Sequence, residues 1–164
     1  MKVMYKLGND ISTDHIYPGR YMATVLPTET PQFAFGDMPD LNKLLNEGDK
    51  TEPRIIVAEH NFGTGSSREQ AVSTLVGHNL IIIAKNFARI FFQNSINLGL
   101  KTVICPDIEA EVGDELIIED DKVINQSKGK EFPVIPIPAA RKAIVDAGGL
   151  IAYTRKLVLE RNAN

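Results

Sequence analysis

The chain has 164 residues, 43% hydrophobic and 24% charged, which is the composition of a globular protein with one sizeable core. A net charge of -3 argues against nucleic-acid binding, and no apolar run is long enough to cross a membrane. The lone cysteine, Cys105, excludes an internal disulfide and cannot by itself ligate an iron–sulfur cluster. Because the N-terminus also lacks the apolar stretch of a signal peptide, we expect one domain over residues 1–164 in the cytoplasm.

The first third of the chain is predicted to contain one strand and a long loop. Residues 3–7 are expected to form the strand, and residues 8–19 are polar and rich in turn formers. Residues 21–50 are interpreted as a long loop with a short helix near residues 41–45. Long loops inside compact domains are commonly functional or mobile.

The middle of the chain alternates strands that are apolar throughout with helices. We predict strands at residues 54–58, 80–84 and 102–105, and helices at residues 67–77 and 87–97. Such an alternation is typical of a parallel sheet that is covered on both faces.

The last third of the chain has a different pattern. Residues 115–119 and 122–125 are predicted to pair as a hairpin, and residues 132–137 to add a strand. Two helices are expected to follow, over residues 138–147 and 150–160. The whole predicts an α/β fold, with a parallel-core sheet and an antiparallel β appendage in one compact unit.

The most informative segment is residues 61–71 (Asn-Phe-Gly-Thr-Gly-Ser-Ser-Arg-Glu-Gln-Ala), between a strand and a helix. Ligands bind at this end of the strands in open α/β sheets. Gly63 and Gly65 allow a sharp turn, and free N–H groups at the helix N-terminus favour an anion. Ser66 and Ser67 add hydroxyls, and Arg68 adds a planar fork that suits a carboxylate.

Other motifs could account for part of this segment. Ser66 and Glu69 have the spacing of a capping box, which would make the serine structural. The phosphate-binding Walker loop needs a lysine that is absent, the dinucleotide pattern needs a glycine where Arg68 stands, and the hydrolase elbow needs a serine between spaced glycines. A site for a small organic anion remains.

Residues 63–71 resemble the Gly-x-Gly-Ser-Ser-Arg-Glu signature of the swivelling domain of the aconitase superfamily. Residues 12–16 (Ser-Thr-Asp-His-Ile), residues 18–21 (Pro-Gly-Arg-Tyr) and residues 84–91 (Ala-Lys-Asn-Phe-Ala-Arg-Ile-Phe) agree with the family in order and spacing. The resemblance covers most of the chain and is closest to free-standing small subunits of 3-isopropylmalate dehydratase and homoaconitase.

This resemblance implies a swivelling β/β/α fold and a large partner subunit that carries a [4Fe–4S] cluster, with no cofactor on this chain. It implies that Ser66 removes the Cα proton of a small hydroxy acid and that Asp14 belongs to the polar network of the catalytic site. Ser67 and Arg68 would hold a substrate carboxylate or stabilise the serine, and Arg20 is a candidate carboxylate ligand.

The residues after Arg20 bear on substrate choice. By resemblance, Met22, Ala23 and Thr24 face the variable group of the substrate, where homoaconitate-specific small subunits tend to place an arginine at the position of Ala23. An apolar environment suits an isopropyl group, because burying a second carboxylate without a partner charge is costly. The expected function is therefore isomerisation of 2-isopropylmalate and 3-isopropylmalate in leucine biosynthesis.

Several alternatives stay open. The chain could serve homoaconitase or 2,3-dimethylmalate dehydratase, or be a non-catalytic dicarboxylate-binding module. A serine hydrolase using Ser66, His60 and Asp14 is a further hypothesis. His78 is expected to cap a helix in its positively charged form. We also expect that the isolated chain can form a homo-oligomer.

Overall fold

A computed structural model describes residues 1–163 and shows a central four-stranded parallel sheet. Its strands lie in the order β1-β2-β3-β4, so each strand neighbours the next one in the chain. The predicted positions of these strands are confirmed to within one residue at each end. Their bounds are Val3–Leu7 for β1, Arg54–Ala58 for β2, Leu80–Ala84 for β3 and Lys101–Ile104 for β4.

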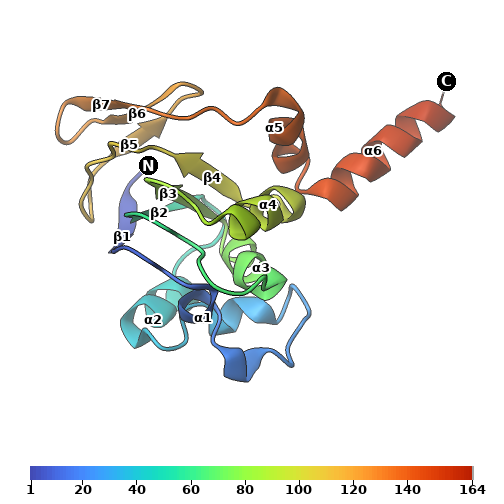
Figure 1. The fold of residues 1–164 in the computed structure, drawn as a ribbon, viewed down its shortest axis with the longest axis horizontal. Coiled ribbons are helices and arrows are strands. Elements are labelled where there is room, and N and C mark those ends of the chain that lie inside the picture. The colour runs from blue at the N-terminus through green and yellow to red at the C-terminus, as the bar shows by residue number, and fades with distance from the viewer. Residues whose placement is uncertain (164) are drawn as a thin grey trace.

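The parallel sheet is the middle of three layers (Figure 1). Helices α1 (Thr13–Ile16), α2 (Pro39–Glu47) and α3 (Glu69–Gly77) lie on one side, and α4 (Arg89–Leu98) packs beside α3. An antiparallel sheet covers the other side. It consists of β5 (Leu116–Ile118), β6 (Lys122–Asn125) and β7 (Lys130–Pro133). The expected α/β fold with an antiparallel appendage is confirmed, and the appendage is the layer that covers the second face.

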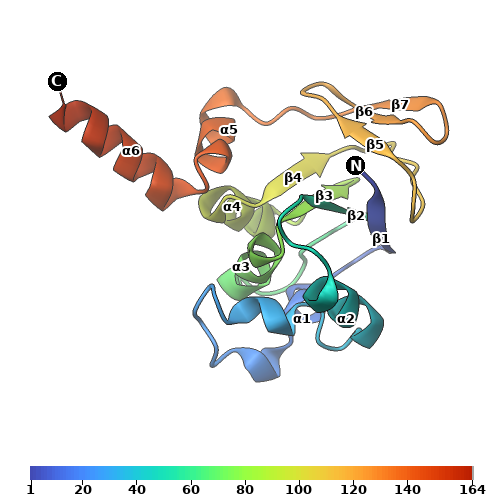
Figure 2. The ribbon, with the colours of Figure 1, turned by 180° about the vertical axis from the view of Figure 1, so that it is seen from behind.

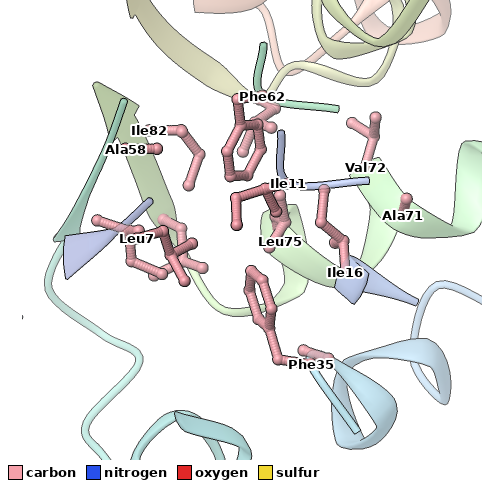
Figure 3. Packing of buried hydrophobic residues seen from close by; sticks show 14 of the residues in the cluster. Leu7, Ile11, Ile16, Phe35, Ala58, Phe62, Ala71, Val72, Leu75 and Ile82 are labelled. Atoms are coloured by element: carbon pink, nitrogen blue, oxygen red, sulfur yellow. The ribbon is translucent and has the colours of Figure 1, made fainter. Parts of the chain in front are cut away.

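Alternate residues of each strand point into different cores, because side chains in a strand alternate between the two faces of the sheet. On the helix side, Ile56 belongs to one buried cluster with Ile82, Phe62 and Leu75. Figure 3 shows the last three of these side chains. On the other side, Ile55 and its alternating neighbours pack against the antiparallel sheet. Both faces are therefore apolar, and each fully buried aliphatic side chain contributes roughly 1.5–3 kcal/mol.

The segment between β1 and β2 has more helical structure than predicted. Residues 8–19 were interpreted as a turn, but they contain α1, which has a capping box. The Ser12 hydroxyl accepts a hydrogen bond from His15 N at 3.2 Å, and His15 Nδ1 accepts one from Ser12 N at 3.1 Å. Two 3₁₀ turns follow, η1 (Gly19–Tyr21) and η2 (Thr30–Phe33), and α2 is longer than the helix expected at residues 41–45. A paired serine and histidine thus explain a helix that apolar periodicity could not reveal.

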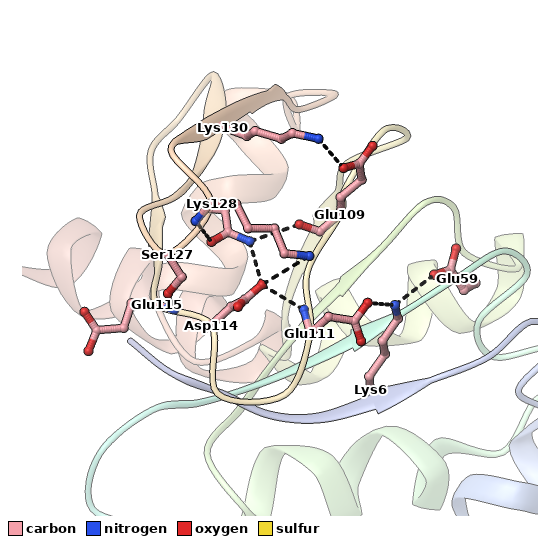
Figure 4. A network of polar contacts seen from close by, with 10 residues as sticks. Lys6, Glu59, Glu109, Glu111, Asp114, Glu115, Ser127, Lys128 and Lys130 are labelled. Carbon is pink, nitrogen blue, oxygen red and sulfur yellow. Dashed lines mark hydrogen bonds and ion pairs between the residues drawn. The ribbon is translucent and has the colours of Figure 1, made fainter.

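Polar contacts join the antiparallel sheet to the connection from β4 (Figure 4). The buried amide of Asn125 donates to the Glu109 carbonyl at 3.0 Å and to the Asp114 carboxylate at 2.8 Å. The Asn125 amide and the Glu111 N–H at 2.9 Å, together with Lys128 at 3.6 Å, hold the pKa of Asp114 below its usual value. Lys6 of β1 reaches Glu111 at 2.7 Å, so the appendage is tied to the parallel sheet as well.

The two C-terminal helices are α5 (Ala139–Asp146) and α6 (Leu150–Asn162), close to their predicted bounds. Figures 1 and 2 show α6 extending away from the body of the protein. It has no buried residue and carries exposed apolar side chains, among them Ile151 and Leu159. Within residues 1–163, no helix combines the length and apolar character needed to cross a membrane.

Candidate functional site

The loops that follow β1, β2 and β3 meet at the carboxyl edge of the parallel sheet. Backbone hydrogen bonds join them: Thr13 N donates to Thr64 O at 2.7 Å, Gly63 N to Ile11 O at 2.7 Å, and Ala88 N to Phe62 O at 2.9 Å. This is the edge at which open parallel sheets bind ligands. Residues 63–68 are called the glycine–serine turn below. Their backbone is therefore held on both sides by neighbouring loops.

Both glycines of the turn adopt backbone conformations that disfavour other residues. Gly63 has φ of +85° and Gly65 has φ of +96°, in the left-handed region that glycine tolerates best. A Cβ at Gly63 would also lie only 2.6 Å from Cδ2 of the buried Phe91. The turn thus approaches α4 too closely to accept a side chain.

The two serines of the turn present their hydroxyls at the surface. Ser66 is exposed, and its Oγ lies 3.4 Å from the Thr13 hydroxyl oxygen. Ser67 Oγ accepts a hydrogen bond from the Asn94 side-chain amide of α4 at 3.3 Å. Each hydroxyl therefore has a polar neighbour from another element and remains accessible.

The structural interpretation of Ser66 as a helix cap is wrong. Helix α3 begins at Glu69, two residues later than predicted, and its N-cap is Arg68, which makes no side-chain capping hydrogen bond. The backbone folds into a tight turn first, in which Arg68 N donates to Ser66 O at 2.9 Å. Ser66 consequently lies outside the helix, and its hydroxyl is free of a capping role.

The guanidinium of Arg68 is fixed by groups of the α1 segment. Its Nη1 is paired with the Asp14 carboxylate and also donates to the Tyr17 carbonyl at 3.1 Å. The Arg68 side chain is 18% exposed, whereas the Asp14 side chain is 60% exposed. Charge-assisted hydrogen bonds of this kind orient a guanidinium well. The structure thus brings together Asp14, Ser66, Ser67 and Arg68.

The other predicted substrate residues form a second, adjacent group. Arg20 is exposed and pairs with Asp37 at 2.6 Å, with its guanidinium 4.5 Å from the centre of the Tyr21 ring. The hydrogen bond from Arg20 lowers the pKa of Asp37, and the same contact raises the pKa of Arg20. Arg20 therefore has a carboxylate partner in this chain, which a substrate carboxylate would have to replace.

The three residues after Tyr21 differ in their surroundings. Met22 packs partly against the helix-side core, Ala23 is exposed, and Thr24 is half-buried. The Thr24 carbonyl accepts a hydrogen bond from the Tyr17 hydroxyl at 3.2 Å. Since the Tyr17 carbonyl contacts Arg68, this tyrosine links the two groups of predicted site residues.

The histidines do not form the hydrolase arrangement that was considered. His60 lies 3.4 Å through its Nδ1 from the Asn86 side-chain amide, while Asp14 is paired with Arg68. A relay from Ser66 through His60 to Asp14 is therefore absent among residues 1–163. His78 does end α3, as expected, but it is buried and donates from Nε2 to the Pro31 carbonyl at 2.7 Å. Burial lowers the pKa of His78 to about 4, so the expectation of a charged cap is wrong.

The described part of the chain does not fit an iron–sulfur cluster. Among residues 1–163, no three His, Cys, Asp or Glu side chains are grouped so that they could hold a metal ion. The buried Cys105 has its Sγ 3.5 Å from the Pro133 carbonyl oxygen. Burial raises the pKa of this thiol to about 11, which disfavours the thiolate that a metal would need.

Two residues of the site had no functional role in the sequence interpretation. Thr13 supplies the hydroxyl next to Ser66, and Tyr17 contacts both Arg68 and the loop after η1. Both lie in the segment interpreted as turn-rich, within four residues of Asp14. Their proximity to the resemblance motif was the one signal in the sequence, since neither residue type indicates catalysis by itself.

Known proteins support the same assignment of fold and family. The profile of the aconitase C-terminal domain matches residues 13–107. A 3-isopropylmalate dehydratase small subunit of Methanosarcina mazei is 44% identical over 162 residues, covering 96% of this chain and 97% of the relative. An isopropylmalate/citramalate isomerase small subunit of Methanocaldococcus jannaschii is 39% identical, covering 96% of this chain and 94% of the relative.

A crystal structure of 3-isopropylmalate dehydratase from Methanocaldococcus jannaschii superposes with a TM-score of 0.87 at 33% identity. It covers 99% of this chain, and this chain covers 96% of it. The agreement thus extends over both sheets and the helical layer. This chain belongs to the aconitase C-terminal domain family and, within it, to the small subunits of the 3-isopropylmalate dehydratase type.

Proposed function

We propose that this chain is the small subunit of a hydro-lyase that interconverts 2-isopropylmalate and 3-isopropylmalate by dehydration and rehydration. The observation that carries the proposal is the glycine–serine turn. It places an exposed Ser66 hydroxyl and a guanidinium fixed by Asp14 at the carboxyl edge of the sheet. The high identity to named small subunits over nearly the whole chain supports the same activity.

In this proposal Ser66 is the base that removes the proton next to a substrate carboxylate. A serine hydroxyl is a weak base unless its alkoxide is favoured by nearby positive charge or hydrogen-bond donors. We propose that the Arg68 side chain and the N–H groups at the start of α3, which follow Ser66 directly in the chain, would supply such an environment. The Thr13 hydroxyl, 3.4 Å from Ser66 Oγ, orients the serine.

The remaining groups of the turn would bind the substrate. Arg68 and Ser67 are proposed to hold a carboxylate, since charge develops there as the proton leaves and fixed donors stabilise it. Asp14 keeps Arg68 in position and belongs to the polar surface of the site. Arg20 is proposed as a second carboxylate ligand, which requires that Asp37 give up its contact.

The relatives that this chain resembles are named small subunits, which implies a larger partner subunit. We propose that this partner carries the [4Fe–4S] cluster and that the active site forms between the two chains. The proposal places both chains in the cytoplasm. A separate prediction is that the isolated chain can form a homo-oligomer, and light scattering of the purified protein tests it.

The preference for an isopropyl group rests on the loop after Arg20. Met22 and Ala23 carry no charge, and a second carboxylate buried against them would lack a partner. Substrates with an extra carboxylate, as used by homoaconitase, are therefore expected to react poorly. A substrate with small alkyl groups, such as 2,3-dimethylmalate with its methyl groups on C2 and C3, is the closer competitor.

Reconstitution tests this function. The chain alone is expected to be inactive, and the complex with a cluster-bearing large subunit is expected to form the unsaturated acid from 3-isopropylmalate. Ser66→Ala should lower kcat by roughly 10²–10⁴-fold, as for loss of a general base, without weakening co-elution with the large subunit. Ser127→Ala, in the turn between β6 and β7, is the matched control, since its hydroxyl contacts Glu115 N of the antiparallel layer, at 2.9 Å.

Full activity of Ser66→Ala would contradict the assignment of the base. A chain that binds malate-like acids by itself, and confers no activity on any large subunit, would instead be a dicarboxylate-binding module.

A further inference from the structure

Residues 22–29, between the two 3₁₀ turns, are called the substrate loop below. Hydrogen bonds hold the two ends of this loop, and the middle of the loop is exposed. Val25 and Leu26 are 62% and 53% exposed, although both are apolar. Under the proposed function, this substrate loop faces the variable group of the hydroxy acid. The contacts at its two ends therefore determine where its apolar residues lie.

Tyr17 holds the first end of the substrate loop. Its buried hydroxyl lies 3.1 Å from the Tyr21 carbonyl and 3.2 Å from the Thr24 carbonyl, and it can donate to either. Its ring packs edge-on against Tyr21, with centroids 6.4 Å apart, and against Phe33 at 6.3 Å. Burial raises the pKa of Tyr17, so the hydroxyl keeps the proton that it donates.

The backbone of the same residue contacts the catalytic turn. The Tyr17 carbonyl accepts a hydrogen bond from Arg68 Nη1 at 3.1 Å. Tyr17 is also the C-cap of α1, where its N–H donates to Thr13 O at 2.9 Å. One residue therefore fixes the guanidinium on one side and the start of the substrate loop on the other.

Helix α3 holds the second end of the loop. The Thr74 hydroxyl donates to the Thr30 carbonyl at 2.9 Å, and His78 donates to the Pro31 carbonyl at 2.7 Å. Both side chains are fully buried. Helix α3 begins directly after the glycine–serine turn. Both ends of the substrate loop are therefore positioned relative to the segment that carries the proposed base.

We propose that Tyr17 is a positioning residue for substrate discrimination: its hydroxyl sets the substrate loop at a fixed place relative to Arg68. This inference rests on the proposed function. Without the hydroxyl, the carbonyl groups of Tyr21 and Thr24 lose the donor that they share. Thr24 N still donates to the Tyr21 carbonyl at 2.9 Å, so the first end of the loop stays attached but is held less firmly. Binding of a bulky side group then suffers more than the chemical step.

The test is Tyr17→Phe in the complex with the large subunit, with 3-isopropylmalate and 3-methylmalate as substrates. The variant keeps the ring contacts and loses only the hydrogen bonds. We expect kcat/KM for 3-isopropylmalate to fall by about tenfold, mainly through KM, as for one lost buried hydrogen bond. The smaller substrate should lose less, so the ratio between the two acids changes about fivefold or more.

Two further variants separate positioning from folding. Tyr153→Phe on α6 is the matched control and should leave the ratio unchanged. Thr74→Val loosens the other end of the loop, and it should shift the same ratio even if Tyr17→Phe proves too unstable to purify.

The outcomes are distinguishable. If the unsubstituted complex turns over neither acid, the proposed function fails. If it is active and Tyr17→Phe keeps the ratio within twofold, the positioning role is wrong. An equal loss for both acids with a lower melting temperature would also overturn the inference, because it would indicate a purely structural tyrosine.

Discussion

Substitution of Gly63 by alanine is expected to destabilise the protein strongly, for two separable reasons. The backbone at this position has φ of +85°, which costs an L-residue about 1–2 kcal/mol. The new methyl group would also lie 2.6 Å from Cδ2 of Phe91 and closer still to its Cβ and Cγ, whereas carbon atoms pack at about 3.5–4.0 Å.

The steric part can be estimated from the packing around Phe91 of α4, whose side chain is buried and whose ring packs edge-on against Phe62. Inserting a methylene-sized group into a well-packed core costs typically about 1–3 kcal/mol, because neighbouring side chains and backbone must shift. Together the two terms predict a loss of about 2–5 kcal/mol in the free energy of unfolding. In urea, with a slope of about 2 kcal/mol per M, the midpoint falls by roughly 1–2.5 M.

Gly113→Ala separates the two terms. Gly113 has φ of +92°, but a Cβ there would meet no atom within 4 Å. This variant should therefore show the backbone cost of about 1–2 kcal/mol alone. The difference between the two urea midpoints measures the contact between the turn and Phe91.

Equal midpoints for the two variants would refute the argument that the turn is packed tightly against α4. An unchanged midpoint for Gly63→Ala would refute the backbone argument as well. Because the turn carries Ser66 and Arg68, we also expect the reconstituted Gly63→Ala complex to lose activity. The Gly113→Ala complex should retain it, since Gly113 lies in the connection to the antiparallel sheet.

Two further predictions follow from buried groups. Burial lowers the pKa of His78 from 6.5 to about 4, so the folded state favours the neutral imidazole, and stability is lost as the pH falls from about 6.5 to about 4. The loss is about 3 kcal/mol, and urea midpoints at pH 7 and pH 4 should differ less in His78→Gln than in the unsubstituted chain. Cys105, whose pKa burial raises to about 11, should not react with a thiol reagent in the native protein at pH 8 and should react fully in urea. Rapid labelling of the native chain would contradict its placement beneath the antiparallel sheet.

The parallel strands were predictable because each is a continuous apolar run. Residues 80–84 are leucine, three isoleucines and alanine, and all are buried, since the sheet is covered on both faces. The glycine–serine turn was predictable for a similar reason, because its residue types have few other uses at a strand–helix junction. The conformation of these segments is determined mainly by their own residues and less by contacts with distant parts of the chain.

The helix bounds and side-chain partners were less predictable. Ser66 and Glu69 have the spacing of a capping box, yet the turn delays the start of α3, and the observed box lies at Ser12 and His15. The charge state of His78 was also misjudged, because η2 packs over the end of α3 and removes the imidazole from water. Contacts between distant segments decided both outcomes.

The amino-acid sequence by itself determined the strands, the position of the glycine–serine turn and the family to which the chain belongs. Only the tertiary structure decided that the antiparallel sheet forms the third layer, and that Asp14 and Tyr17 hold Arg68. Apolar periodicity and glycine conformation act over a few neighbouring residues, so they can be recognised in a sequence. The contact between Asp14 and Arg68 joins residues 54 positions apart, and it exists only after the parallel sheet has brought their loops to one edge.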